Sequence, residues 1–352
     1  MRRPVFLLIA PVMLSVFAGG IRAQDSPRNP PMVDQRRDAE KENYFALFNN
    51  LKRVSSSDSQ RRAYEAAIEY LKRFEGENDP DARTVREFVT EYEKPARESE
   101  IFNTYNSKNY PKTFELGRAM LKHDPENFFV LAVLTEAGLD NAQAGDASLN
   151  EATVDYAKKA IQLLEAGKVT RVAPFKNIEG ARGYLNAAVG TLLRDKSPAG
   201  AAQAFRKAVQ SDSFYRNDPL TYHRLGIAIL KGEFAQLSSE YNEKYGAQRS
   251  SSAQQAMLKR LNTLVEQAID AYARAVALSD PARLETKPET VTTKSDNATG
   301  KPDSSVSAAV PFPPGLRSKI LEQLTALYKG FHNNSDAGLN ELISTVLSKP
   351  LP

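Results

Sequence analysis

Residues 201–212 read AAQAFRKAVQSD, and the spacing within this stretch decides the fold class. Ala201, Phe205 and Ala208 stand at i, i+4 and i+7, which places all three on one face of a helix. The same order of small, aromatic and small residues returns at Ala268, Tyr272 and Ala275, and in weaker form at Thr153, Ala157 and Ala160. The recurrence predicts a repeated helix and not an isolated one.

A second helical segment precedes the helices at 201–212 and 268–275. Its apolar face is formed by Leu185, Ala188, Val189 and Leu192 in one case, and by Tyr222, Leu225, Gly226 and Ile229 in the other. Small residues let two helices approach closely, and an aromatic side chain fills the gap to the next pair. Asp-Pro steps at residues 124–125, 218–219 and 280–281 separate the segments. The sequence therefore predicts helix pairs in succession.

This pattern resembles the tetratricopeptide repeat, a helix–turn–helix unit that recurs along a chain. The resemblance covers residues 94–281 as four units, two of them good and two degenerate, and residues 40–93 could add one more pair. Two departures stand out: tryptophan is absent, and residues 237–261 form an insertion that we interpret as helix extensions around a Gly/Ser-containing turn. The resemblance implies an all-α fold, an α–α superhelix of stacked helix hairpins. An irregular helical bundle with coincidental spacing is the alternative.

The flanking segments predict further organisation. Residues 1–23 have a charged start, an apolar run and a small residue at position 23, which is typical of a cleaved signal peptide, with an uncleaved anchor as the alternative. We expect a flexible leader at 24–39, the repeat domain at 40–284 and a disordered linker at 285–314. Residues 315–352 predict a C-terminal helical hairpin whose second helix is capped by Ser335 or Asp336.

Composition limits the function classes. The chain contains no cysteine, so it forms no disulfide and carries no lipid on a cysteine. Residues 1–23 hold three arginines and no acid, so the net charge of +4 falls to +1 after their removal. Such a balance gives no support for nucleic-acid binding. We expect a protein exported to the periplasm or beyond, without stable membrane insertion, if the source is bacterial.

Motifs of catalysis are missing from the sequence. His123, His223 and His332 stand far apart and form no HExxH pattern, and no nucleophile or phosphate-binding motif occurs. Acidic stretches such as EGENDPD are more typical of solvated helix faces than of a glycosidase pair. We predict no catalytic residue, no metal, no cofactor and no enzymatic activity.

The resemblance instead implies binding of a peptide or protein segment along the first helices of the units. The residues expected to face that segment are Phe102, Tyr105, Ala132, Glu136, Leu139, Asn186, Arg194, His223, Ile227 and Lys231. Phe102 and Tyr105 would supply apolar anchors, and the polar and basic residues from Asn186 onward would suit a carboxylate or an acidic segment. Their being ordinary surface residues stays open.

Two other functions remain as alternatives. One is an envelope hydrolase or glycan-processing enzyme that uses helical repeats as a substrate platform. The other is a structural subunit whose groove is filled by its own C-terminal hairpin or by a second copy. The primary expectation is a scaffold that binds a protein of the cell envelope or a secreted protein.

Overall fold

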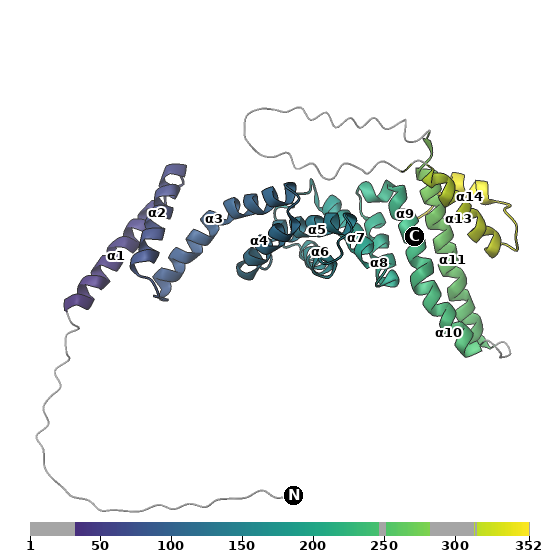
Figure 1. Ribbon diagram of the computed structural model, residues 1–352, viewed down its shortest axis with the longest axis horizontal. Helices are drawn as coiled ribbons and strands as arrows, with labels where there is room; N and C mark the ends of the chain where they lie inside the picture. Colours follow the sequence, from purple (N-terminus) through teal and green to yellow (C-terminus); the bar gives the residue numbers. More distant parts are fainter. Residues whose placement is uncertain (1–31, 246–250, 282–312, 314, 352) are drawn as a thin grey trace, which may run out of the picture. The chain divides into compact units, whose positions relative to one another are not determined.

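The computed structural model describes residues 32–245, 251–281, 313 and 315–351. Every regular element in these ranges is a helix, and no strand occurs among them (Figure 1). The all-α expectation is confirmed. The expected signal peptide at 1–23 and nearly all of the expected linker at 285–314 lie outside the described residues. Within the described ranges, no helix is both long and apolar enough to pass through a bilayer.

The chain divides into two compact units between Glu93 and Lys94. The first contains α1 (Met32–Lys52), α2 (Ser57–Arg73) and the start of α3 (Pro80–Asn106). Its core is a cluster of aromatic and small side chains contributed by all three helices, namely Phe48, Ala63, Ala67, Tyr70, Phe74, Ala82 and Val85. The division falls beside Pro95, which removes one backbone donor from the interior of α3.

Helix α1 corrects the expected leader. It begins at Met32, directly after Pro31, so residues 32–39 are helical and do not belong to a flexible segment. Arg37 forms an ion pair with Glu77, and Lys41 forms ion pairs with Glu77 and Asp79. These contacts hold the start of α1 against the connection between α2 and α3.

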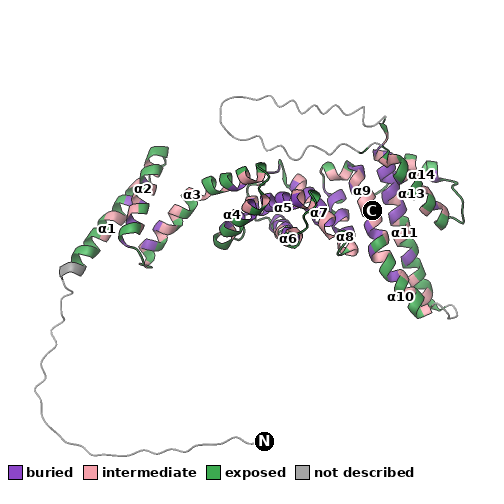
Figure 2. Cartoon of the chain, in the orientation of Figure 1, coloured by how far each residue is buried: buried purple, intermediate pink, exposed green. Residues whose placement is uncertain are grey.

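The second unit consists of successive helix pairs. After the end of α3 come α4 (Tyr110–His123), α5 (Phe128–Gln143), α6 (Asn150–Glu165), α7 (Ile178–Leu193) and α8 (Pro198–Gln210). A short 3-10 turn, η1 (Phe214–Asn217), leads into α9 (Pro219–Ile229). Buried residues run along most of α5 and α7, because each has neighbours on several sides (Figure 2). The first helices of the pairs are therefore α3, α5, α7 and α9.

The opening stretch AAQAFRKAVQSD forms α8, and Ala201, Phe205 and Ala208 are fully buried in it. A Cβ atom added at Gly190 of α7 would come within 2.8 Å of the Phe205 ring. The next pair repeats this contact, since a Cβ at Gly226 of α9 would lie 3.1 Å from the Tyr272 ring. The small residue on the first helix thus makes room for the aromatic residue on the second, as the spacing predicts.

The expected insertion is a pair of helix extensions. A π-helical turn, η2 (Leu230–Phe234), continues α9 into α10 (Ala235–Tyr245), and α10 packs beside the long α11 (Ser252–Leu278) (Figure 1). A Cβ at Gly232 would lie 2.4 Å from the backbone nitrogen of Ala199, so the π turn rests directly on the start of α8. The expected turn between the extensions falls at residues 246–250, outside the described residues.

The C-terminal hairpin docks on α11. It comprises α13 (Leu316–Phe331), α14 (Leu339–Thr345) and a 3-10 turn, η3 (Val346–Ser348), and its apolar residues join one core with those of α8, α9 and α11. The expected side-chain cap of the second helix is wrong. Gly338, with φ of 90°, stands at that position, where a residue with a side chain would be strained. Ser335 instead accepts a bond from Ala337, and Asp336 pairs with Lys329.

Candidate functional site

Seven of the ten residues expected to face a bound segment have aromatic, polar or charged side chains, and these seven lie on first helices or directly after them. Phe102 and Tyr105 belong to α3, Glu136 to α5, Asn186 to α7 and His223 to α9. Arg194 is the residue that ends α7, and Lys231 lies in the π turn η2. The structure separates them into groups with very different surroundings.

Phe102 and Tyr105 pack against α5. The Phe102 ring lies 6.2 Å from the Phe129 ring, and the Tyr105 hydroxyl donates to Asp140 Oδ2 at 3.1 Å. Both side chains are half-buried. Tyr105 is therefore an oriented polar group and not only the apolar anchor that the sequence suggests.

Glu136 is the most unusual of the seven. Only 9% of the residue is exposed, and within the described part of the chain it forms no hydrogen bond or ion pair. Burial and the negative charge of Asp140, one helical turn away, together raise the pKa of Glu136 to about 8. A buried carboxyl group without a partner is costly, since native proteins normally pair such groups.

Three tyrosines lie within electrostatic reach of Glu136. Tyr105 comes from α3, Tyr184 from α7 and Tyr215 from η1, and the charge of Glu136 raises the pKa of all three, although desolvation is the larger cause in each. The rings of Tyr184 and Tyr215 meet edge to face at 6.4 Å. We refer to Tyr105, Glu136, Asp140, Tyr184 and Tyr215 as the tyrosine–carboxylate cluster. Its positive neighbour is Lys108, whose charge lowers the pKa of Asp140 against a net rise caused by burial.

Asn186 and Arg194 are engaged within their own segments. Asn186 is 3% exposed, and its side-chain amide donates to the carbonyl of Arg182 in the same helix. Arg194 forms a forked ion pair with the adjacent Asp195, at 3.2 and 2.9 Å. Lys231 is exposed, and its charge adds to that of Arg194 in lowering the pKa of Asp195. Part of the expected positive charge is thus already balanced.

Arg224 of α9 is a basic residue that the sequence argument does not single out. It is partly buried and makes no hydrogen bond or ion pair with another described residue. Burial lowers its pKa, and the nearby charge of Arg194 adds to that effect while Asp218 opposes it. Tyr215 is within electrostatic reach of both Arg224 and Glu136, so it joins the cluster to this arginine.

His223 faces the C-terminal hairpin. Its Nε2 lies 3.0 Å from Oε1 of Gln323 in α13, and its ring is 5.6 Å from that of Tyr272. Burial lowers the pKa of His223. Of the seven expected residues, it is the one for which the described contacts include the hairpin. The hairpin therefore covers one end of the row of first helices and leaves the cluster near α5 untouched.

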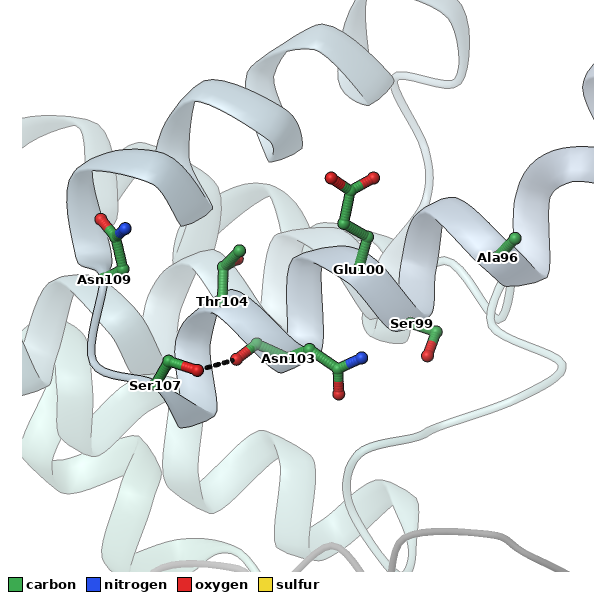
Figure 3. Close-up of a pocket in the computed structure, with 7 residues that line it drawn as sticks. All are labelled: Ala96, Ser99, Glu100, Asn103, Thr104, Ser107 and Asn109. Atoms are coloured by element: carbon green, nitrogen blue, oxygen red, sulfur yellow. Dashed lines mark hydrogen bonds between the residues drawn. The ribbon is translucent and has the colours of Figure 1, made fainter.

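Two hollows of the described structure are lined by other residues. One, of about 510 Å³, runs beside the end of α3 (Figure 3) and is lined by Ala96, Ser99, Glu100, Asn103, Thr104, Ser107 and Asn109. In this hollow the Ser107 hydroxyl donates to the backbone carbonyl of Asn103 (Figure 3). Some polar groups of the lining are therefore already bonded to the backbone of α3. Another, of about 440 Å³, lies along the exposed start of α11, at residues 255–266. No group of three or more potential metal ligands comes together among the described residues.

The sequence held partial signals for the residues that it missed. Asp140 stands four residues after Glu136, the spacing that places two side chains on one helix face. Tyr215 and Arg224 carry no such signal, because their nearness to α5 and α7 arises only when the pairs stack.

Comparison with protein-family models, with curated proteins and with solved structures finds no match to this chain.

Proposed function

We propose that this chain is an exported, non-enzymatic scaffold, similar to tetratricopeptide-repeat proteins, that binds a segment of another protein across its first helices. The observation that carries the proposal is the pair Glu136 and Arg224. The charges of both act on Tyr215, and neither side chain has a partner among the described residues. A bound segment of complementary charge would supply the missing interactions.

The helix-pair architecture supports the same function. Stacked helix pairs present their first helices side by side as an extended surface, and such surfaces suit an extended peptide better than a small molecule. The contacts Gly190–Phe205 and Gly226–Tyr272 recur at equivalent places in two pairs, which favours a repeat over an irregular bundle. The sequence of residues 1–23 supports export.

The alternative of a hydrolase draws on one observation. Glu136 beside Asp140 has a raised pKa, a property shared with general acids. The two hollows described above are lined by other residues, so neither brings a substrate to this carboxyl group. The second alternative is a groove filled by the C-terminal hairpin. The hairpin helices α13 and α14 pack with α9 and α11, which disfavours this alternative for the region around Glu136.

Site-specific photocrosslinking in cells tests the proposal. A photoreactive amino acid replaces Lys231 on the first-helix side, and in a matched variant it replaces Gln203, an exposed residue of the second helix α8. We expect a discrete crosslinked adduct from the Lys231 position and none from Gln203. The double variant Arg194→Glu/Lys231→Glu should reduce capture of the same adduct by a probe at Asn103. Adducts from Gln203 alone would overturn the proposal.

A further inference from the structure

We infer that the surface of α11 around Arg274 is a binding site for an extended, proline-containing peptide segment, and that residues 349–351 of this chain occupy it as an internal ligand. The inference concerns a different surface from the proposed function and does not rest on it. One contact carries it: the Arg274 guanidinium group, 2% exposed, donates to the backbone carbonyls of Lys349 and Pro350 at 3.2 and 2.6 Å.

The surroundings of Arg274 fix it for this contact. Asp270, one turn earlier in α11, accepts from Nε at 2.6 Å and so orients the guanidinium group. The ring of Tyr222 in α9 has its centre 6.0 Å from the guanidinium carbon. The turn η3, with Val346 fully buried, packs on α11. A charged side chain that is enclosed and oriented in this way binds acceptors at a defined position.

The contact involves the backbone of the segment and not its side chains. The side chains of Lys349 and Pro350 are exposed. Arginine has donors and no acceptor, whereas proline has a carbonyl acceptor and no backbone donor. The backbone donor of Lys349 already bonds to the carbonyl of Val346. Proline at position 350 thus presents an acceptor to Arg274 without adding a donor that would need a partner.

The charge balance selects carbonyl groups over an anion. Asp270 forms an ion pair with Arg274 through Nε, and its second oxygen lies 3.4 Å from a terminal nitrogen of the same guanidinium group. The positive charge of Arg274 is therefore already matched. The donors that remain need neutral acceptors, and an extended peptide supplies two of them on adjacent residues.

The segment can leave this site while the hairpin stays docked. The buried apolar residues of the hairpin all precede it, namely Ile320, Leu324, Tyr328, Leu339 and Val346. A stretch held mainly by hydrogen bonds opens locally more easily than a packed core. Arg274 would then keep buried donors without acceptors, which is costly. The vacated site therefore favours another extended segment of the same kind, supplied by a partner protein.

The test removes the internal ligand and supplies it as a peptide. The chain is ended after Ser348, and acetyl-Ser-Lys-Pro-Leu-Pro-amide, which has the sequence of residues 348–352, is titrated into it. The readouts are the ¹H–¹⁵N resonances of the Arg274 side chain and the thermal midpoint. We expect the peptide to shift these resonances and to raise the midpoint. The full-length chain should bind it at least roughly tenfold more weakly, because its own segment competes at a high effective concentration.

Matched comparisons identify the contact. Arg274→Lys in the shortened chain keeps the charge without the planar fork and should weaken peptide binding roughly fivefold or more. Arg260→Lys, at an exposed position of the same helix, should bind as the unsubstituted shortened chain does. The same peptide with alanine in place of both prolines should bind more weakly.

Three outcomes would overturn the inference: no response of the shortened chain to the peptide, equal affinity of Arg274→Lys, and equal affinity for the alanine peptide. Circular dichroism checks that the shortened chain keeps its helices. If it does not, the full-length variant Pro350→Ala/Leu351→Ala, whose segment competes less well, takes its place in the same titrations.

The outcome is separate from that of the proposed function. Photocrosslinking at Lys231 without a peptide response at Arg274 would retain the scaffold and reject the site on α11. A peptide response without crosslinking would establish the site on α11 and reject the scaffold function of the first helices.

Discussion

The two ends of the second unit treat a buried charge in opposite ways. Arg274 in α11 is 2% exposed and fully provided with partners: it bonds to Asp270 at 2.6 Å and to the carbonyls of Lys349 and Pro350 at 3.2 and 2.6 Å. Glu136 in α5 is 9% exposed, and the negative charge of Asp140 adds to the effect of burial on its pKa. The first arrangement fastens the end of the chain to α11, whereas the second leaves a carboxyl group that keeps its proton up to about pH 8.

The difference follows from what the neighbouring elements supply. The chain after η3 passes Arg274 in extended form, and its carbonyls point at the guanidinium group. Around Glu136, α3, α7 and η1 supply tyrosines, whose hydroxyls have pKa values raised by the surroundings and stay neutral. Burying an ionisable group is costly in either case, but only the paired arginine contributes to holding the fold together.

The largest expected effect is a dependence of stability on pH that Glu136 controls. In the unfolded chain this carboxyl group ionises near its ordinary pKa of 4.5, whereas in the folded chain it keeps its proton up to about pH 8. Between these values the unfolded state has lost a proton that the folded state still holds, so raising the pH favours unfolding. The full loss, reached above the folded pKa, is on the order of 5 kcal/mol.

Urea unfolding followed by circular dichroism at about pH 5 and about pH 9 measures this loss. Glu136→Gln should remove most of the difference between the two pH values and should be the more stable protein at the higher one. Glu322→Gln, which removes an exposed carboxylate of α13 with the same change in formal charge, should behave as the wild type does. An unchanged pH dependence in Glu136→Gln would show that this carboxyl group is solvated or paired.

The next largest effect concerns the paired charge. Arg274→Met removes the guanidinium group and leaves Asp270 and two carbonyls without their donor, so we expect a loss of about 3 kcal/mol in the free energy of unfolding. Arg274→Lys keeps the charge but has no planar fork, and it should recover only part of the loss. Equal stability of Arg274→Met and the wild type would remove the contrast between the two buried charges.

These two sites also show which contacts can be predicted from the sequence and which cannot. The spacing of Ala201, Phe205 and Ala208 predicts a buried helix face, and all three are fully buried. Periodicity is a property of one helix, and it reports burial against the nearest partner. It does not report that α5 has neighbours on several sides, so Glu136, expected on an exposed surface, is almost enclosed.

Local and long-range features explain the remaining differences. The ion pair between Arg194 and Asp195 can be predicted, because the two residues are adjacent in the sequence. The role of Arg274 is not, because its carbonyl partners lie more than 70 residues away, at Lys349 and Pro350. Arg224 in α9 is partly buried, whereas Lys231 in the π turn η2, which continues α9, is exposed. Packing between the helix pairs sets that difference.

A smaller effect is expected from shortening the chain. Truncation after Ser348 removes the two carbonyl acceptors of Arg274 but leaves its bond to Asp270, so the loss should be about 1–2 kcal/mol and less than that of Arg274→Met. Amide hydrogen exchange should quicken in α14 and η3, which this clamp holds near α11, and stay unchanged in α5. Faster exchange throughout the unit would indicate that the clamp supports more than the hairpin.

The smallest effect concerns the one hydrogen bond that joins α3 to the tyrosine–carboxylate cluster. Tyr105→Phe removes the hydroxyl that donates to Asp140, which should reduce stability by about 1 kcal/mol at neutral pH. Because this bond lowers the pKa of Asp140, its loss should also raise that pKa. The carboxyl resonance of Asp140, followed with pH, measures the change, whereas Tyr156→Phe, a tyrosine whose hydroxyl bonds to no described residue, should leave the pKa of Asp140 unchanged. A pKa of Asp140 that does not rise in Tyr105→Phe would mean that the Tyr105 hydroxyl does not stabilise this carboxylate.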